Sequence, residues 1–168
     1  MFVDESGANI TLVPRYGRAP RGERCYGAQP RGHYQHLTLL ASLSLAGMEA
    51  PMILDGAADR AAFRVYIEQV LVPTLRPHQV VILDNLSVHK QPALRRAVEA
   101  AGCRVLFLPT YSPDLNPIEQ AFSKIKQLVR RVGARTTQAL EVALAEALAQ
   151  VTPADASGFF RGCGYAPQ

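Results

Sequence analysis

Three acidic residues stand beside apolar or turn-rich segments of the sequence. Asp84 directly follows a short apolar run, Asp4 is expected to end a first strand, and Glu119 opens a helix after a proline-rich loop. Carboxylates at the ends of buried elements repel one another unless a positive charge joins them there. Two divalent cations and a nucleic-acid phosphate would fill that role, because hard cations prefer carboxylate oxygens and two ions can clamp a phosphoryl transfer. The pattern therefore favours metal-dependent phosphodiester chemistry.

Each carboxylate also has a purely local interpretation. Asp4 could start a turn, and Asp84 could cap the segment after its strand. Glu119 has the sharpest alternative, because Asn116, Pro117 and Glu119 read as N-cap, N1 and N3 of a helix, and Glu at N3 is the capping-box residue. If Glu119 were only a cap, Asp114 would be the first candidate for the third ligand. Taken singly, each local interpretation is the commoner one.

Other polar residues near the acids or in basic segments are candidates for supporting roles. Asn85 and His89 follow Asp84 closely and could contact the metal ligands from behind or bind a phosphate; for His89 a solvent-facing position is an equal alternative. A turn-rich segment carries arginines interleaved with tyrosines, and one flank of a later helix is basic, which suits contact with a DNA backbone. The candidates for DNA contact are Arg15, Arg18, Arg21, Arg24, Lys126 and Arg130. The alternative for both groups is an ordinary solvated surface.

The composition suits one compact folded domain. The chain has 168 residues, of which 48% are apolar and 19% charged, and its net charge of +4 favours a polyanionic partner. Its three cysteines form no C-x-x-C pair, which argues against a zinc site or a disulfide framework and favours a reducing compartment. The sequence shows no signal peptide and no apolar stretch long enough to span a bilayer, so we expect a cytoplasmic protein.

The spacing of apolar residues predicts strands first and then alternating helices and strands. The expected strands cover residues 2–4, 10–13, 36–45, 80–83 and 104–108, and the expected helices cover residues 57–75, 92–101, 117–132 and 137–151. Such an order favours an α/β fold with helices packed on a mixed sheet. Because the carboxyl ends of central strands gather at one crevice, the three acids can meet there. We expect one domain over residues 1–151 and a loop-like C-terminal tail over residues 152–168.

Four stretches of the chain read as motifs, together with the Gly164-Tyr165 ending. They are Phe2–Gly7, Tyr16–Arg24, Ile82–Lys90 and Leu108–Glu119. They resemble the catalytic domain of DDE transposases in the mariner-like superfamily, specifically the bacterial insertion-sequence branch called the IS six-thirty group. The pattern Leu-Pro-x-Tyr-Ser-Pro-x-Leu-Asn-Pro-Ile-Glu is long and rarely assembled by chance. With these motifs around the acids, the metal site is favoured over three separate local roles.

The resemblance implies a ribonuclease-H-like mixed sheet with helices on both faces, and Asp4, Asp84 and Glu119 as ligands of two Mg²⁺ or Mn²⁺ ions. It implies DNA cleavage at insertion-sequence ends and strand transfer to target DNA, by a homodimer in the active complex. The family usually carries helix-turn-helix modules upstream, and only three residues precede Asp4, so we expect end recognition to be missing from this chain. Two alternatives stay open: an inactive remnant that binds DNA without catalysis, and a nuclease of the same fold that only hydrolyses.

Overall fold

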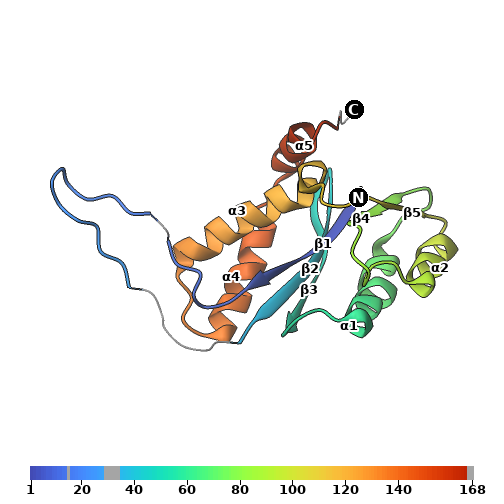
Figure 1. Ribbon diagram of the computed structural model, residues 1–168, viewed down its shortest axis with the longest axis horizontal. Coiled ribbons are helices and arrows are strands. Elements are labelled where there is room, and N and C mark those ends of the chain that lie inside the picture. The colour runs from blue at the N-terminus through green and yellow to red at the C-terminus, as the bar shows by residue number, and fades with distance from the viewer. Residues whose placement is uncertain (15, 29–34, 166–168) are drawn as a thin grey trace.

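The computed structural model describes residues 1–14, 16–28 and 35–165 and is built on one five-stranded mixed sheet (Figure 1). The spatial order of the strands is β3-β2-β1-β4-β5. Strand β1 pairs antiparallel with β2 and parallel with β4, while β2–β3 is antiparallel and β4–β5 is parallel. The strands are β1 (Phe2–Ala8), β2 (Leu37–Ser44), β3 (Gly47–Asp55), β4 (Val80–Leu83) and β5 (Arg104–Phe107).

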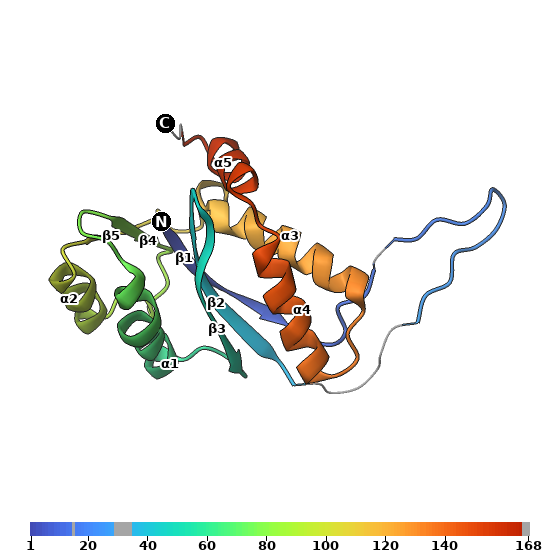
Figure 2. The same cartoon turned by 180° about the vertical axis from the view of Figure 1, so that it is seen from behind.

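Helices cover both faces of this sheet (Figures 1 and 2). On one face α3, α4 and α5 share a hydrophobic core with β1 and β2, and on the other face α1 and α2 share a second core with the opposite sides of the strands. The helices are α1 (Arg60–Val65, continued by π-helical and 3-10 turns to Thr74), α2 (Pro92–Ala100), α3 (Pro117–Val132), α4 (Thr137–Ala149) and α5 (Pro153–Gly162). The expected mixed sheet with helices on both faces is confirmed.

The alternation of side chains along β1 decides which residues reach which layer. Phe2 belongs to the core beneath α3 and Val3 to the core beneath α1 and α2. Because successive side chains of a strand point to opposite faces, Asp4 lies on the α3 face and Glu5 on the α1 and α2 face. Asp4 and Glu5 are adjacent in the sequence but therefore lie on opposite faces of the sheet.

The N-terminal segment differs from the expected pair of short strands. One strand, β1, runs from Phe2 to Ala8, so Asp4 lies inside it rather than at its end. Residues 10–13 are not a strand, because Asn9 closes a turn by accepting hydrogen bonds from the Thr11 backbone N–H and hydroxyl. Ile10 and Leu12 instead pack against the core from this turn, which explains their apolar pattern.

Three further differences concern elements at the margins of the fold. Strand β3 was not expected, and β5, expected to be a core strand, is an edge strand with alternating exposed residues. The expectation of a loop after residue 151 is also wrong, because α5 forms there and buries Ala156 in the core beneath α3. A capping box between Thr152 and Asp155 starts this helix. The domain boundary at residue 151 stays a prediction.

No helix within the described ranges has both the length and the apolar character needed to cross a membrane.

Candidate active site

The register of two parallel strands places the first two acids side by side. Val3 of β1 pairs with Leu83 of β4, so the next residues along both strands are Asp4 and Asp84. Asp84 lies just past the end of β4, and Asp4 faces the start of α3, where Asn116 bonds to it. The sequence patterns that suggested these two acids therefore converge on one place in the fold.

Asp4 is buried and held by two hydrogen bonds. It is only 6% exposed; its Oδ1 accepts from the Glu5 backbone N–H at 2.8 Å and its Oδ2 accepts from Asn116 Nδ2 at 2.7 Å. Burial raises the pKa of Asp4 to about 7, and the nearby charges of Glu5, Glu119 and Asp84 act in the same direction, against the Glu5 N–H bond. A carboxylate with this pKa is a strong candidate for a site completed by a cation.

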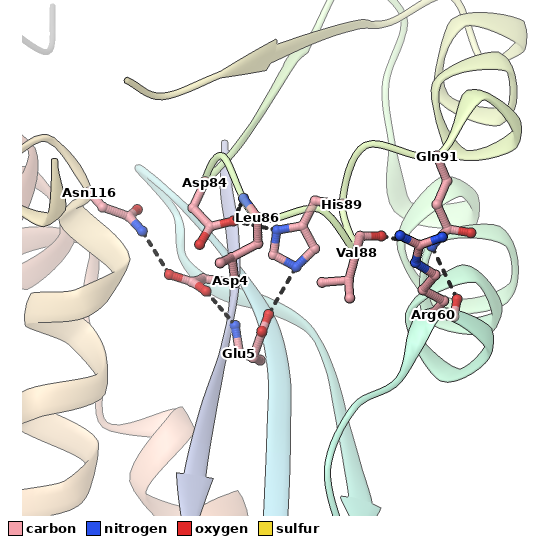
Figure 3. Close-up of polar contacts among 9 residues, drawn as sticks. All are labelled: Asp4, Glu5, Arg60, Asp84, Leu86, Val88, His89, Gln91 and Asn116. Atoms are coloured by element: carbon pink, nitrogen blue, oxygen red, sulfur yellow. Dashed lines mark hydrogen bonds and ion pairs between the residues drawn. The ribbon is translucent and has the colours of Figure 1, made fainter. Parts of the chain in front are cut away.

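Asp84 is fixed from behind by a histidine (Figure 3). Its Oδ1 accepts from the Leu86 backbone N–H at 3.1 Å and lies 2.5 Å from His89 Nδ1, while His89 Nε2 lies 3.1 Å from Glu5 Oε2. His89 is fully buried and its ring packs on Phe63, with 4.1 Å between ring centroids. Of the two alternatives for His89, the solvent-facing position is therefore wrong.

Two carboxylate partners require His89 to donate from both ring nitrogens, which makes it an imidazolium. Burial lowers the pKa of His89, but the hydrogen bonds to Asp84 and Glu5 outweigh burial and raise it to about 9. In the same way, burial raises the pKa of Asp84, and the bonds from His89 and Leu86 overcome it and leave the pKa below its usual value. Asp84 is thus kept ionised, with its other oxygen, Oδ2, outside this network.

Glu119 completes the set of acids around one pocket. It lies in the first turn of α3, and it lines a cavity of about 290 Å³ together with Asp4 and Asp84. The capping box considered from the sequence does not form, because the Asn116 side chain bonds to Asp4 and makes no cap hydrogen bond. Pro113 also lines the pocket and Asp114 does not, which leaves Asp114 a weaker candidate than Glu119.

The donor chemistry of this pocket fits a hard divalent cation. Its three acids offer oxygen ligands, and the buried Asn116 Oδ1 has no hydrogen-bond partner within the described part of the chain. No three His, Cys, Asp or Glu side chains of residues 1–14, 16–28 and 35–165 lie close enough to ligate one ion together. The carboxylates therefore share a pocket without forming a closed ligand group.

The remaining candidates from the sequence lie in different surroundings. Asn85 lines the pocket and donates from Nδ2 to Thr110 Oγ1 at 2.7 Å, which ties the loop after β4 to the loop before α3. Arg15 lies outside the described residues. The other basic candidates lie on the surface. Arg18, Arg21 and Arg24 are exposed and belong to the long excursion after β1 that Figure 1 shows, and Lys126 and Arg130 are partly exposed on α3.

Sequence reasoning missed two residues that contact the acids. Glu5 was passed over because it neighbours Asp4, and only the strand alternation shows that it serves a different face. The sequence predicts that the Asn116 side chain caps a helix, whereas this side chain bonds to an acid 112 positions away. Glu5 carries no sequence signal of its partner His89, because the contact spans β1 and the loop after β4.

Comparison with solved structures defines the class of fold. The chain matches the Mos1 strand transfer complex with a TM-score of 0.69 and 19% identity, covering 97% of this chain and 50% of that one. It matches the catalytic domain of Mos1 mariner transposase with a TM-score of 0.62 and 17% identity, covering 97% and 75%. The catalytic core of BIV integrase matches at 0.51 and 15%, covering 72% and 84%. These likenesses identify a ribonuclease-H-like fold of the kind found in transposase and integrase catalytic cores.

The family follows from the sequence itself. The family model of DDE superfamily endonucleases matches residues 1–141, and the chain belongs to that family. No curated protein sequence matches it. The chain spans about half the length of the Mos1 chains in the transposition complexes. Membership of the insertion-sequence branch stays a prediction.

Proposed function

We propose that this chain is a transposase catalytic domain, which cleaves DNA at the ends of an insertion sequence and transfers the freed strand to target DNA. The observation that carries the proposal is the pocket shared by Asp4, Asp84 and Glu119 in a DDE superfamily endonuclease. The similar Mos1 structures support it, because they are a strand transfer complex and paired-end complexes with Mg or Mn.

Asp4, Asp84 and Glu119 would hold two Mg²⁺ or Mn²⁺ ions. When bound, such a pair stabilises the attacking and the leaving oxygen of an in-line phosphoryl transfer. The protein's own part is to present ionised carboxylates in a fixed place. Asn116 orients Asp4 through its amide, and His89 orients Asp84 through its imidazolium. Because the pKa of Asp4 is about 7, Asp4 gives up its proton when a cation binds near neutral pH.

The DNA partner would lie along α3 and the excursion after β1. Helix α3 runs from the pocket toward the end of the molecule where residues 16–28 project (Figure 1). Lys126 and Arg130 lie two and three turns past Glu119 on this helix, so both suit phosphate contacts away from the reacting bond. We expect two copies of the chain in the active complex, one for each element end, acting in the cytoplasm on nucleoid DNA.

The test is a single assay that measures both DNA cleavage and strand transfer. Purified protein is incubated with supercoiled plasmid and Mn²⁺, and with a labelled oligonucleotide that carries a free 3′-hydroxyl. We expect nicking and joining by the parent, and at least a hundredfold loss for Glu119→Gln with an unchanged fold, because the neutral amide does not hold a hard cation. Asp114→Asn is the matched control on the neighbouring turn and keeps parental activity.

Each alternative gives its own outcome in this assay. Nicking without joining indicates a nuclease that only hydrolyses, and a folded parent that binds DNA with neither product indicates an inactive remnant. If Glu119→Gln cleaves DNA as the parent does, Glu119 is not a metal ligand. If only Asp114→Asn loses activity, Asp114 is the third ligand instead.

A further inference from the structure

Tyr111, at the rim of the acid pocket, is conformationally costly and has no packing role. It is 97% exposed and lines the same pocket as Asp4, Asp84 and Glu119. Its φ is +56°, in the left-handed region that a bulky residue with a Cβ adopts only against a steric penalty. Folding alone would favour Gly or Asn at this turn. Strained residues of this kind concentrate at functional sites.

The surrounding chain holds Tyr111 in this position from both sides. Before it, Leu108 donates its backbone N–H to the Leu83 carbonyl at 2.8 Å, and Thr110 accepts the hydrogen bond from Asn85. After it, the Tyr165 hydroxyl donates to the Leu115 carbonyl at 2.8 Å. The loop is therefore tied to β4, to the loop after β4 and to the C-terminal segment, and it presents a free aromatic ring at a fixed place.

The opposite loop adds an apolar neighbour on the same pocket. Leu86 is 48% exposed and lines the cavity two residues past Asp84. An apolar side chain and an aromatic ring thus border a pocket whose floor is acidic. A phosphate group gains no favourable contact from an apolar and an aromatic side chain. A nucleotide does, because it carries a flat base beside its phosphate that can stack on them.

We propose that Tyr111, with Leu86 lining the same pocket, forms a stacking site for an unpaired or extruded nucleobase next to the phosphate that the acids engage. The inference rests on the proposed function, because it takes that phosphate to lie in the acid pocket. A base inside a duplex already stacks on its neighbours, so the site selects DNA in which the base beside the reacting phosphate has left the stack. Stacking is tolerant of base identity, and the site contributes affinity without sequence preference.

The experiment measures DNA binding by the full chain with two matched probes. One is a fully paired duplex, and the other is the same duplex ending in a short unpaired 3′ tail with 2-aminopurine at the junction. We expect the parent to bind the tailed probe more tightly and to quench the 2-aminopurine. Tyr111→Gly is expected to bind the tailed probe about 5- to 150-fold more weakly, the range of losing one aromatic stack, and the paired probe as the parent does. Tyr111→Phe keeps the ring and the parental affinity.

Protein stability gives the second readout, with His78→Gly as the control. His78 is also exposed with a positive φ, of +72°, and does not line the pocket. Both glycine variants relieve a left-handed residue, so we expect neither to melt below the parent, and only Tyr111→Gly to lose tailed-probe affinity.

Four results would overturn the inference. Parental binding of both probes by Tyr111→Gly removes the stacking site and leaves the proposed function intact. A lower melting temperature for Tyr111→Gly makes the ring structural, and a changed oligomeric state in sedimentation makes it a contact between copies. If the parent binds neither probe, the proposed function fails and takes the inference with it.

Discussion

The carboxylate of Asp84 is held in place by His89, and His89 in turn contacts a second carboxylate, that of Glu5. His89 is buried between Asp84 and Glu5, and only a charged ring satisfies both (Figure 3). Residues that orient a ligand from behind typically change metal affinity or activity by about 10- to 100-fold when they are replaced. We therefore propose that Glu5 is a positioning residue that acts through His89, on the face of the sheet opposite to Asp4.

Replacing Glu5 by Gln tests this chain of contacts. A raised folded pKa means that the His89 ion pairs contribute stability that is complete below the unfolded pKa near 6.5 and is lost as the pH rises through about 9. Glu5→Gln removes one charged acceptor and lowers the pKa of His89 in the folded state, so we expect the alkaline loss of stability to be smaller and to end at a lower pH. Melting temperatures from pH 6 to pH 10 measure it, and cleavage is expected to fall about tenfold.

The control for this variant is Glu99→Gln, which removes an exposed carboxylate paired with Arg95 on α2. An alkaline profile of Glu5→Gln that overlays the parent and Glu99→Gln would show that Glu5 does not support the charge on His89.

Asp84 and Glu119 were predictable because each follows a readable local signal, whereas Asp4 lies inside β1 and not at the strand end that the sequence suggested. Asp84 ends an apolar run, and Glu119 follows a loop with three prolines. The Glu5–His89 contact and the Asn116–Asp4 bond were not predictable, because each joins residues more than 80 positions apart. Such contacts depend on the register between strands and on the face to which each side chain points, and neither can be read from a single sequence.

The elements that support the pocket differ in how firmly the sequence specifies them. Helix α3 was predicted with its observed bounds, since Pro117 begins it and Gly133, in the left-handed conformation, ends it. Strand β3 was missed because it contains Pro51 and is only partly buried as an edge strand. Helix α5 was missed because its two glycines suggested a loop, although Thr-Pro-Ala-Asp at its start is a capping-box signal.

The carboxylate of Asp155 on α5 bonds to Lys124 on α3, and its pKa gives a pH test of this contact. Hydrogen bonds from Lys124 and then from Thr152 lower the pKa of Asp155 to about 2. A lowered folded pKa means that this contribution is present above the unfolded pKa near 3.8 and is lost as the pH falls through 2. We expect Asp155→Asn to melt below the parent at pH 7, with the difference closing between about pH 4 and pH 2.

Lys124→Met gives the matching half of a double-mutant cycle. If the two variants destabilise additively, or if the difference for Asp155→Asn persists below pH 2, the Asp155 carboxylate does not fasten α5 through Lys124.

The acid pocket lies at one end of a basic path, which Lys126 and Arg130 form along α3. The chain carries a net charge of +4, and Lys126 and Arg130 continue from the pocket along α3. If both contact phosphates, replacing both by Ala weakens binding equally for all DNA sequences. The dependence of log affinity on log salt is expected to become shallower by about one for each lost contact. Titrations of a labelled duplex at several salt concentrations give this slope.

The control for the basic path is Arg64→Ala with Arg96→Ala. These arginines are exposed on α1 and α2, across the sheet from α3, and carry the same total charge. If the two double variants gave equal slopes, Lys126 and Arg130 would not contact DNA phosphates and would be ordinary solvated surface residues.

The most direct test of the central claim is the melting temperature of the parent with and without Mn²⁺ at pH 8, where Asp4, with its pKa of about 7, is mostly ionised. A cation bound only by the folded state at about 100 times its Kd adds about 2.7 kcal/mol, which for a domain of this size raises the melting temperature by about 5–10 °C. We expect this rise at pH 8, a smaller rise at pH 6 because Asp4 must first release its proton, and little or none in Asp84→Asn. A parent whose melting temperature is unchanged across millimolar Mn²⁺ at pH 8, or an equal rise in Asp84→Asn, would contradict a metal site formed by these three acids.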